Sequence, residues 1–278
     1  MIIGSHVDFK KETGLYGSVL KSLSYNSNTF MFYTGAPQNT KRCEVDSVLT
    51  KKAHDLMKEN GIDINNVIIH APYIINMANE SNYLFNVSFL NDEIKRAKEL
   101  GIKKIVIHPG SHVGLGIEKG IQNIINVLNN SDDGVDILLE TMAGKGTEIG
   151  SNFYELKKIM DGVSKKIYIC LDTCHLNDSG YDLNDFDSVL EEFDKVIGLK
   201  YIKCVHINDS KNKMGSRKDR HENIGYGLIG FDNMIKIIYN DKLKDVPKIL
   251  ETPYINDMPP YKEEIESILN KKFNKNLK

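Results

Sequence analysis

Seven residues whose side chains commonly bind metal ions stand at regular intervals along the chain. They are His6, His70, His108, Glu140, Asp172, His206 and Glu251, and each ends or closely follows a short apolar run. Imidazole and carboxylate ligands together suit Zn²⁺, Mn²⁺ or Fe²⁺. A single histidine in such a place is more often hydrogen-bonded structure, but several imidazoles and carboxylates crowded into one cleft repel or lie desolvated unless cations neutralise them. The set exceeds what one ion needs, so the sequence predicts a multinuclear metal site.

Two loops add residues of the same chemical type. His175 follows Asp172 across a tight bend, and Asp219 and His221 form an Asp-x-His pair in the long loop after His206. The same loop carries a cluster of basic side chains, namely Lys211, Lys213, Arg217, Lys218 and Arg220. A charged loop alone usually indicates only a solvated surface. Beside a metal cluster it favours contact with phosphate.

Short buried strands and amphipathic helices are the elements that must position these residues. Apolar runs of about four to six residues recur without polar alternation, which is typical of parallel strands buried on both faces. The runs lie within residues 2–7, 29–35, 66–72, 104–110, 136–141, 167–173, 202–209 and 248–253. Helical patterns lie between them, for example at residues 44–60, 91–101 and 186–198, and the last two end in glycine, a common helix stop.

The spacing of the strand ends predicts the architecture. From His70 onward the last polar residues of successive runs are roughly 32 to 45 residues apart, close to the ~30 or more expected for one strand–helix–strand unit. Eight strands alternating with about eight helices predict a (β/α)8 TIM barrel. The alternative, an open doubly wound sheet, lacks a GxGxxG motif after the first strand. No linker divides the chain, so we expect one domain over residues 1–278, with a short basic tail from about residue 271 that is frayed and solvated.

Composition excludes several classes of protein. The 278 residues carry a formal net charge of −2, and 27% are charged with mixed signs, which excludes a disordered acidic or basic chain. No apolar run approaches the ~18–20 residues that span a bilayer, and no signal peptide is evident, so we expect a cytoplasmic protein without a membrane partner. Four scattered cysteines, Cys43, Cys170, Cys174 and Cys204, predict reduced thiols rather than a disulfide scaffold.

The sequence around these residues resembles the endonuclease IV family of apurinic/apyrimidinic endonucleases. The motifs are HPGSH at His108, ET at Glu140, LDTCH at Leu171, HIND at His206, DRHENIG at Asp219 and ETP at Glu251, and the resemblance spans the first strand to the eighth. It implies a barrel with three Zn²⁺ ions, with Mn²⁺ or Fe²⁺ as alternatives at some sites. It also implies an enzyme that cuts double-stranded DNA 5′ to an abasic site, leaving a 3′-hydroxyl, and that removes blocking groups from 3′ ends. We expect a monomer, associated with the nucleoid if the source is bacterial.

The resemblance assigns the ligands residue by residue. It implies one ion at His70, His108 and Glu140, a second at Glu140, Asp172, His206 and Glu251, and a third at His175, Asp219 and His221. Glu140 is expected to be catalytic as well, because a carboxylate that bridges two ions can orient the attacking hydroxide. His112 and His6 are expected to support the site without being ligands, and His54 is expected to be an ordinary helix histidine.

The match is looser in the loops that would contact DNA. Gln38, Tyr73 and Ile74 occupy the region where family members insert side chains at the lesion, and Arg217 and Arg220 are candidates for phosphate contact. A wedge of this kind lowers the cost of kinking the duplex and extruding a nucleotide. For Tyr73, buried packing is an equally good interpretation. An arginine would be more familiar than Gln38 at its position.

Two other classes of function remain open at this point. A sugar isomerase or epimerase of the xylose isomerase-like barrels would share the architecture and use one or two divalent ions. The Asp-x-His pair and its basic neighbours favour the nuclease. A non-catalytic DNA-binding protein would be expected to have lost ligands, and none of the nine ligand positions departs from the family pattern.

Overall fold

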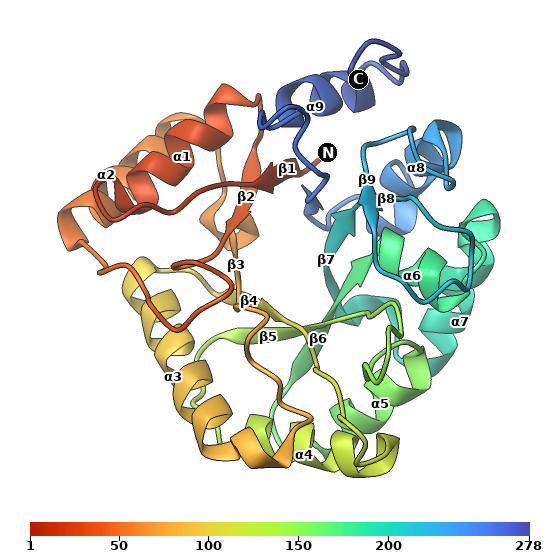
Figure 1. Ribbon diagram of the computed structural model, residues 1–278. Helices are drawn as coiled ribbons and strands as arrows, with labels where there is room; N and C mark the ends of the chain where they lie inside the picture. Colours follow the sequence, from red (N-terminus) through yellow and green to blue (C-terminus); the bar gives the residue numbers. More distant parts are fainter.

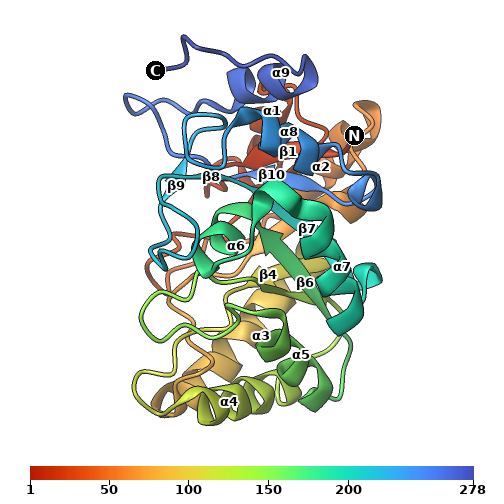
Figure 2. The same cartoon turned by 90° about the vertical axis from the view of Figure 1, so that its right-hand side faces the viewer.

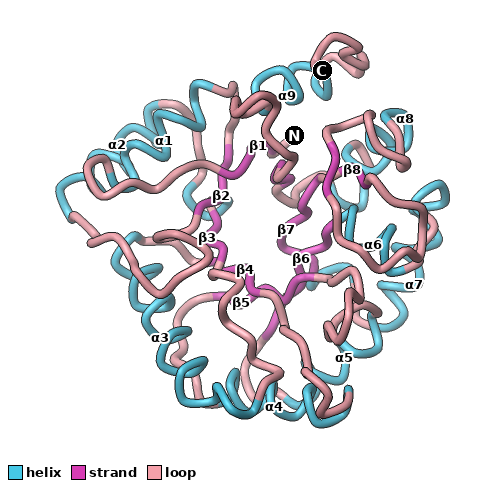
Figure 3. The backbone as a smooth tube through the Cα atoms, in the orientation of Figure 1, coloured by secondary structure: helices cyan, strands magenta, loops and turns pink.

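The computed structural model describes residues 1–278, which form a closed barrel of parallel strands with helices around it. The strand order is β1-β10-β7-β6-β5-β4-β3-β2, with a separate two-stranded sheet of β8 and β9. The barrel is seen end-on in Figure 1, and Figure 3 shows its ring of strands enclosed by helices. The predicted (β/α)8 TIM barrel is confirmed, and the open doubly wound sheet is excluded because the sheet closes on itself.

The barrel strands are β1 (Ile3–His6), β2 (Thr29–Phe32), β3 (Ile68–His70), β4 (Lys104–Ile107), β5 (Asp136–Glu140), β6 (Ile167–Asp172), β7 (Ile202–Ile207) and β10 (Lys248–Leu250). The helices are α1 (Gly14–Ser24), α2 (Ser47–Glu59), α3 (Tyr83–Leu100), α4 (Ile117–Asn129), α5 (Phe153–Gly162), α6 (Thr173–Ser179), α7 (Phe186–Val196), α8 (Phe231–Ile238) and α9 (Tyr261–Leu269). The small sheet pairs β8 (Asp209–Ser210) with β9 (His221–Glu222). None of the helices combines the length and apolar character that crossing a membrane requires.

Strand periodicity explains how the barrel positions the chemistry. Side chains on a strand alternate between its two faces, so residues two apart face the same side. One buried layer inside the barrel contains Met31, Ile68, Val106, Leu138, Tyr168, Cys170, Cys204 and Ile249. Two positions after six of these stand residues of metal-ligand type, for example His70 after Ile68 and Glu140 after Leu138. The apolar layer thus supports a polar layer at the C-terminal ends of the strands.

Two expectations about the ends of elements need adjustment. The helix expected within residues 91–101 begins earlier, at Tyr83, and ends as predicted at Gly101, which adopts a left-handed conformation (φ 73°). The basic C-terminal tail was expected to be frayed, and this is wrong for the segment from 271. Phe273 packs against Tyr226 and Phe231 with ring centroids 5.0 and 5.5 Å apart. The tail packs against the barrel through the aromatic ring of Phe273. The expectation of fraying considered only its lysines and did not take this ring into account.

Helix α9 places one buried carboxylate behind the C-terminal ends of the strands. Glu264 accepts hydrogen bonds from the Ile224 amide (2.9 Å), the Asn223 side chain (3.2 Å) and the Thr252 hydroxyl. It therefore ties together the chain segments that follow β9 and β10. Burial raises the pKa of Glu264 from 4.5 to about 7, although these hydrogen bonds oppose the shift.

The raised pKa of Glu264 predicts a specific pH dependence of stability. The folded protein binds this proton more tightly than the unfolded chain, so the stabilisation is complete below about pH 4.5 and is lost as the pH rises through about 7. Relative to Glu264→Gln, whose amide stays neutral, the wild type should lose roughly 3 kcal/mol of unfolding free energy between pH 4.5 and 8. Urea denaturation at a series of pH values measures this difference. Glu263→Gln, an exposed neighbour, should keep the wild-type profile, and parallel curves for Glu264→Gln and wild type would contradict the assignment.

Candidate metal centre

A cavity of about 280 Å³ opens at the C-terminal ends of the barrel strands. Its walls are formed by His6, Tyr33, His70, His108, Glu140, His175, Asp219, His221, Glu251 and Tyr261. The long loops that carry some of these residues gather on one side of the barrel, as the view in Figure 2 shows. Asp172 and His206 complete the group from positions that are fully buried.

Glu140 is the centre of the group. It is the last residue of β5 and is almost completely buried. Its Oε2 lies 3.2 Å from Nε2 of both His70 and His108, and its Oε1 lies 3.2 Å from Nδ1 of both His175 and His206. One carboxylate therefore contacts four imidazoles from four different segments of the chain.

Asp172 occupies a helix start, which fixes its orientation. It is the N-cap of α6, and its Oδ1 accepts a hydrogen bond from the His175 amide at 2.7 Å, as expected of aspartate at this position. Its Oδ2 accepts a hydrogen bond from the Asn208 side chain at 2.7 Å. Glu251, which directly follows β10, has its Oε2 3.2 Å from His206 Nδ1. Asp172 Oδ2 lies 3.9 Å from the same nitrogen, so the two strand-end carboxylates converge on one imidazole.

The third group of candidate ligands depends on the loop between β8 and β9. Asp219 Oδ1 lies 3.1 Å from His175 Nε2 and 3.5 Å from His221 Nε2. Asp219 has a positive φ of 55°, a conformation that costs free energy for most residues but that aspartate tolerates. The Asp-x-His pair predicted from the sequence therefore meets His175 through a specific loop conformation.

A buried aspartate that sequence reasoning missed holds this loop in place. Asp178 Oδ2 accepts hydrogen bonds from the Asp219 amide (2.9 Å) and the Asn212 side chain (3.0 Å), and its Oδ1 accepts one from the Ser210 hydroxyl (2.7 Å). Its backbone carbonyl accepts a hydrogen bond from the Arg217 amide at 2.9 Å. No sequence signal distinguishes Asp178 from an ordinary helix residue, because the loop groups that it binds lie more than 30 residues away.

The donor atoms present fit divalent cations. Ligand atoms lie within 4.8 Å of one another in three groups without cysteine: His70, Glu140 and His206; Glu140, Asp172, His206 and Glu251; and His175, Asp219 and His221. Two further groups include cysteine: Cys170, Cys204 and His206; and Asp172, Cys174 and His221. Three buried ring nitrogens at this end of the barrel, Nε2 of His6, of His206 and of His221, have no hydrogen-bond partner. Mixed nitrogen and oxygen donors with unpartnered imidazole atoms suit Zn²⁺, Mn²⁺ or Fe²⁺.

Opposite charges at short range control ionisation in the site. Burial disfavours the charged form of Glu140, but the His206 and His108 imidazoles hold its pKa well below its usual range. Burial likewise opposes ionisation of Asp219, whereas contact with His175 lowers its pKa to about 2. Burial disfavours protonation of His175, yet the Asp172 and Asp219 carboxylates raise its pKa well above 6.5. Divalent cations and protons would therefore compete for the imidazoles.

The three remaining histidines that were singled out have different environments. His6 lines the cavity with its ring centroid 4.6 Å from that of Tyr33, and burial lowers its pKa to about 4, so it is neutral. His112 does not line the cavity; its Nδ1 accepts a hydrogen bond from the Gly116 amide at 3.1 Å within its own loop. His54 lies on α2 with Nε2 2.9 Å from the Leu100 carbonyl oxygen.

The residues expected to contact DNA lie on surface loops rather than in the cavity. Tyr73 is 53% exposed, so the alternative of buried packing is wrong for this side chain. Ile74 is half-buried and packs against the hydrophobic core. Gln38, Arg217 and Arg220 are exposed, the first on the loop after β2 and the two arginines beside Asp219. The structure therefore leaves Tyr73, but not Ile74, free to contact a partner with most of its ring.

An arginine that was not predicted organises the loop of Gln38. Arg42 donates hydrogen bonds to the carbonyl oxygens of Ala36 (2.9 Å), Lys41 (2.9 Å) and Asn39 (2.7 Å). Its Nε lies 2.8 Å from the fully buried Glu93 carboxylate of α3. The arginine in this loop is thus committed to holding the backbone, and Gln38 is left as the exposed polar side chain.

Two tyrosines of the cavity wall were also missed. Tyr33 directly follows β2, and its ring centroid lies 5.0 Å from that of His70. Burial and the Glu251 carboxylate raise its pKa well above 10, so the phenol stays protonated. Tyr261, the first residue of α9, also lines the cavity. Tyr33 could have been predicted from the sequence, because it stands at the end of the second apolar run, where the other strands carry their site residues. Tyr261 follows no strand, so its sequence position gives no such signal.

Comparison with known proteins gives concordant matches. A family model described as the xylose isomerase-like TIM barrel, AP endonuclease family 2, matches residues 21–271. "Probable endonuclease 4" of Acholeplasma laidlawii is 52% identical over 288 residues, covering 100% of this chain and 98% of the relative. The protein of the same name from Staphylococcus aureus is 50% identical over 292 residues with the same coverage.

Solved structures agree with these relatives. Endonuclease IV from Thermus thermophilus superposes with a TM-score of 0.85 at 27% identity, covering 98% of this chain and 100% of that chain. A D-tagatose 3-epimerase-like protein shares the fold with a TM-score of 0.67 at 22% identity, covering 98% of this chain and 96% of that one. The family model and the full-length relatives, rather than the fold, decide between them: this chain belongs to the endonuclease IV family of apurinic/apyrimidinic endonucleases.

Proposed function

We propose that this protein is a metal-dependent DNA repair endonuclease. It hydrolyses the phosphodiester 5′ to an abasic site, leaves a 3′-hydroxyl and removes blocking groups from 3′ ends. The observation that carries this proposal is the convergence of nine ligand-type side chains around one cavity, with four imidazoles in contact with the Glu140 carboxylate. The endonuclease 4 relatives of similar length support it.

Three divalent cations, Zn²⁺ with Mn²⁺ or Fe²⁺ as alternatives, would be held by three sets of residues. The first set is His70, His108 and Glu140; the second is Glu140, Asp172, His206 and Glu251; the third is His175, Asp219 and His221. Such ions supply Lewis acidity, lower the pKa of a water molecule and offset the charge of a phosphate. The chain carries no Lys or Arg among the residues that line the cavity, so these ions would be its source of positive charge.

Glu140 has the position required of the group that orients the attacking water. Its carboxylate is ionised and faces imidazoles on both of its oxygens, which fixes its direction. A fixed carboxylate accepts a hydrogen bond from water and aligns its lone pair with the phosphorus for in-line attack. Tyr33, whose hydroxyl stays protonated, is placed to donate a hydrogen bond at the edge of the same cavity.

Double-stranded DNA would be held by loops around the cavity. The net charge of −2 gives no general attraction for DNA, but the exposed residues Lys211, Lys213, Arg217, Lys218 and Arg220 concentrate positive charge beside Asp219. Tyr73, on the loop after β3, is the exposed aromatic side chain suited to insertion between bases. We infer a monomeric, single-domain enzyme, because one chain supplies both the cavity and these loops.

The alternative function is that of a sugar isomerase or epimerase that uses one or two divalent metal ions. The feature that favours the nuclease is the third group of ligands, because two of its members, Asp219 and His221, come from a segment outside the barrel that also carries basic residues. A sugar isomerase needs neither a third group of metal ligands nor basic residues beside its cavity. The number of bound ions therefore separates the two functions.

Metal analysis of the purified protein is the first test. We expect three equivalents of divalent metal per chain by elemental analysis after dialysis. A strong chelator should abolish cleavage of a duplex with one abasic site, and Zn²⁺ should restore it. Asp219→Asn should lower the stoichiometry by about one ion, because it removes the carboxylate contacting His175 and His221. One or two ions in the wild type, or cleavage that resists chelation, would contradict the proposal.

Substitution at Glu140 tests the catalytic assignment. Glu140→Gln keeps the size of the side chain but removes its charge, so we expect kcat for abasic-site cleavage to fall by roughly 10³-fold or more, on the scale of losing one aligned charged group. DNA affinity, measured by fluorescence anisotropy, should change much less. Glu118→Gln, on the exposed surface of α4, serves as the matched control and should cleave normally. Near-normal cleavage by Glu140→Gln would refute the role.

Tyr73 provides a test of the wedge. Loss of one aromatic stacking contact costs about 1–3 kcal/mol, so Tyr73→Ala should lower kcat/KM on abasic duplex by roughly five- to 150-fold. The metal content should be unchanged, because Tyr73 does not line the cavity. Tyr154→Ala removes another exposed tyrosine, on the outer helix α5, and should leave kcat/KM unaltered. Equal effects of the two substitutions would rule out the wedge.

A further inference from the structure

Two cysteines lie directly beneath the candidate ligands. Cys170 of β6 and Cys204 of β7 are paired across the strands, and both are fully buried. A register shift between Ile169 and Cys170 brings Cys204 opposite Cys170. Each cysteine stands two positions before a candidate ligand, Asp172 or His206, so its side chain faces the barrel interior below that residue.

Only one of the two ring nitrogens of His206 has polar contacts. Its Nδ1 lies 3.2 Å from Glu140 Oε1 and 3.2 Å from Glu251 Oε2. Its Nε2 is buried and has no hydrogen-bond partner. A buried ring N–H without an acceptor is costly, and imidazoles that hold metal ions usually donate their second N–H to a neighbouring acceptor.

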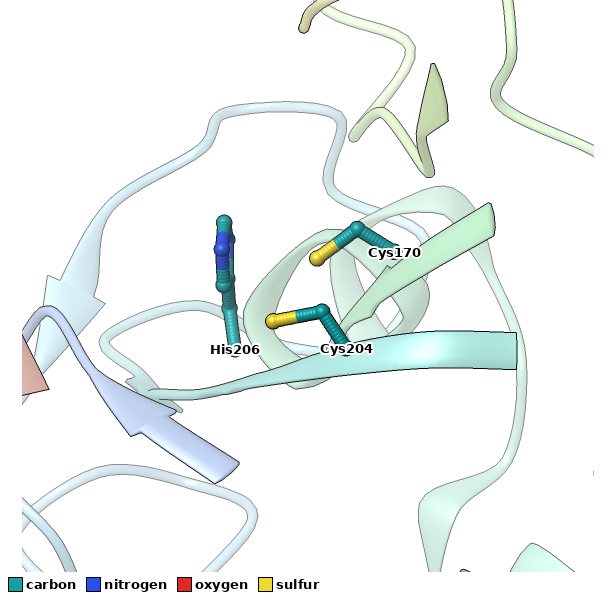
Figure 4. A group of neighbouring side chains, drawn as sticks. All are labelled: Cys170, Cys204 and His206. Atoms are coloured by element: carbon teal, nitrogen blue, oxygen red, sulfur yellow. The ribbon is translucent and has the colours of Figure 1, made fainter. Parts of the chain in front are cut away.

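Two thiols also lie beside this ring. Sγ of Cys170, Sγ of Cys204 and a ring nitrogen of His206 all lie within 4.8 Å of one another. Figure 4 shows both sulfur atoms directed toward the imidazole. Apart from Tyr168, the other side chains of this barrel layer, Met31, Ile68, Val106, Leu138 and Ile249, carry no hydrogen-bonding nitrogen or oxygen.

We propose that Cys170 and Cys204 are positioning residues whose sulfur atoms accept a hydrogen bond from His206 Nε2–H. With a cation at Nδ1, the neutral imidazole carries its proton on Nε2, and this N–H needs an acceptor. The thiol pair therefore fixes the rotation of the ring so that Nδ1 points at Glu140 and Glu251. This inference rests on the proposed function, in which His206 is a ligand of the second ion.

Two double variants of similar size separate hydrogen bonding from packing. Cys170→Ser with Cys204→Ser keeps acceptors, whereas Cys170→Val with Cys204→Val fills the space without one. In the valine pair we expect the affinity for the most weakly held Zn²⁺, measured by competition with a chromophoric chelator, to fall 10- to 100-fold. The serine pair should stay within a few-fold of wild type. Cys43→Val, at a half-buried thiol outside the site, controls for the loss of a thiol as such.

Long-range ¹H–¹⁵N spectra of the Zn²⁺-loaded protein provide a readout that does not depend on cleavage. The His206 Nε2–H should exchange slowly in the wild type and in the serine pair, and should shift in the valine pair. Circular dichroism and thermal melting confirm that each variant folds. If the valine pair keeps both the resonance and the affinity, the thiols only fill space and the proposal is wrong.

Cadmium titration tests the competing interpretation, in which Cys170 and Cys204 form a metal site of their own. If Cd²⁺ binds as an extra equivalent with sulfur-to-metal charge-transfer absorption that both variants lose, the cysteines form a metal site of their own and the proposal is overturned. Absence of that absorption supports it. A wild type that fails to cleave abasic DNA while the spectra behave as expected would refute the proposed function and leave this inference intact.

Discussion

A carboxylate buried among four imidazoles is the constraint on which the site depends. Glu140 has little contact with water, so its charge is stabilised only by the groups that surround it within 3.2 Å. Removing one partner from such a cluster leaves a buried charge uncompensated, which is costly. Each segment that delivers an imidazole must therefore end at one point in space. A closed barrel meets this requirement because its strand ends form a ring whose positions the sheet fixes.

Buried carboxylates outside this ring hold the loops that the barrel does not fix. Asp178 accepts hydrogen bonds from the loop that carries Asp219, and Asp209 accepts them from the amides of Gly225, Gly227 and Ile229 after β9. Glu264 does the same for the segment that begins at Asn223. Each carboxylate satisfies backbone donors that would otherwise be buried without partners. The loops near the site are therefore anchored by buried hydrogen bonds.

The parts of this structure that can be predicted from the sequence are those in which residue types repeat with the regular spacing of a strand or a helix. His70, Glu140 and Asp172 end buried strands, and the alternation of side chains along a strand is enough to place them at one end of the barrel. Asp178 and Arg42 could not be identified in this way, because their roles depend on loop carbonyls and amides whose positions follow only from the folded chain. Likewise, the exposure of Tyr73 depends on how its loop lies over the core, and neither its type nor its position determines that.

The barrel itself does not determine the chemistry, since an epimerase-like protein shares it with a TM-score of 0.67. What this chain adds is the segment between β8 and β9, which brings Asp219 and His221 to His175 and concentrates basic residues on its exposed side. Both effects come from one loop, so the third group of ligands and the positive surface beside it are coupled through the same hydrogen bonds to Asp178. A loop of this kind can differ between barrels without disturbing the strands, because its supports are side chains outside the barrel wall. Divergence of function on this fold then requires changes in a few loop residues and in the carboxylate that holds them.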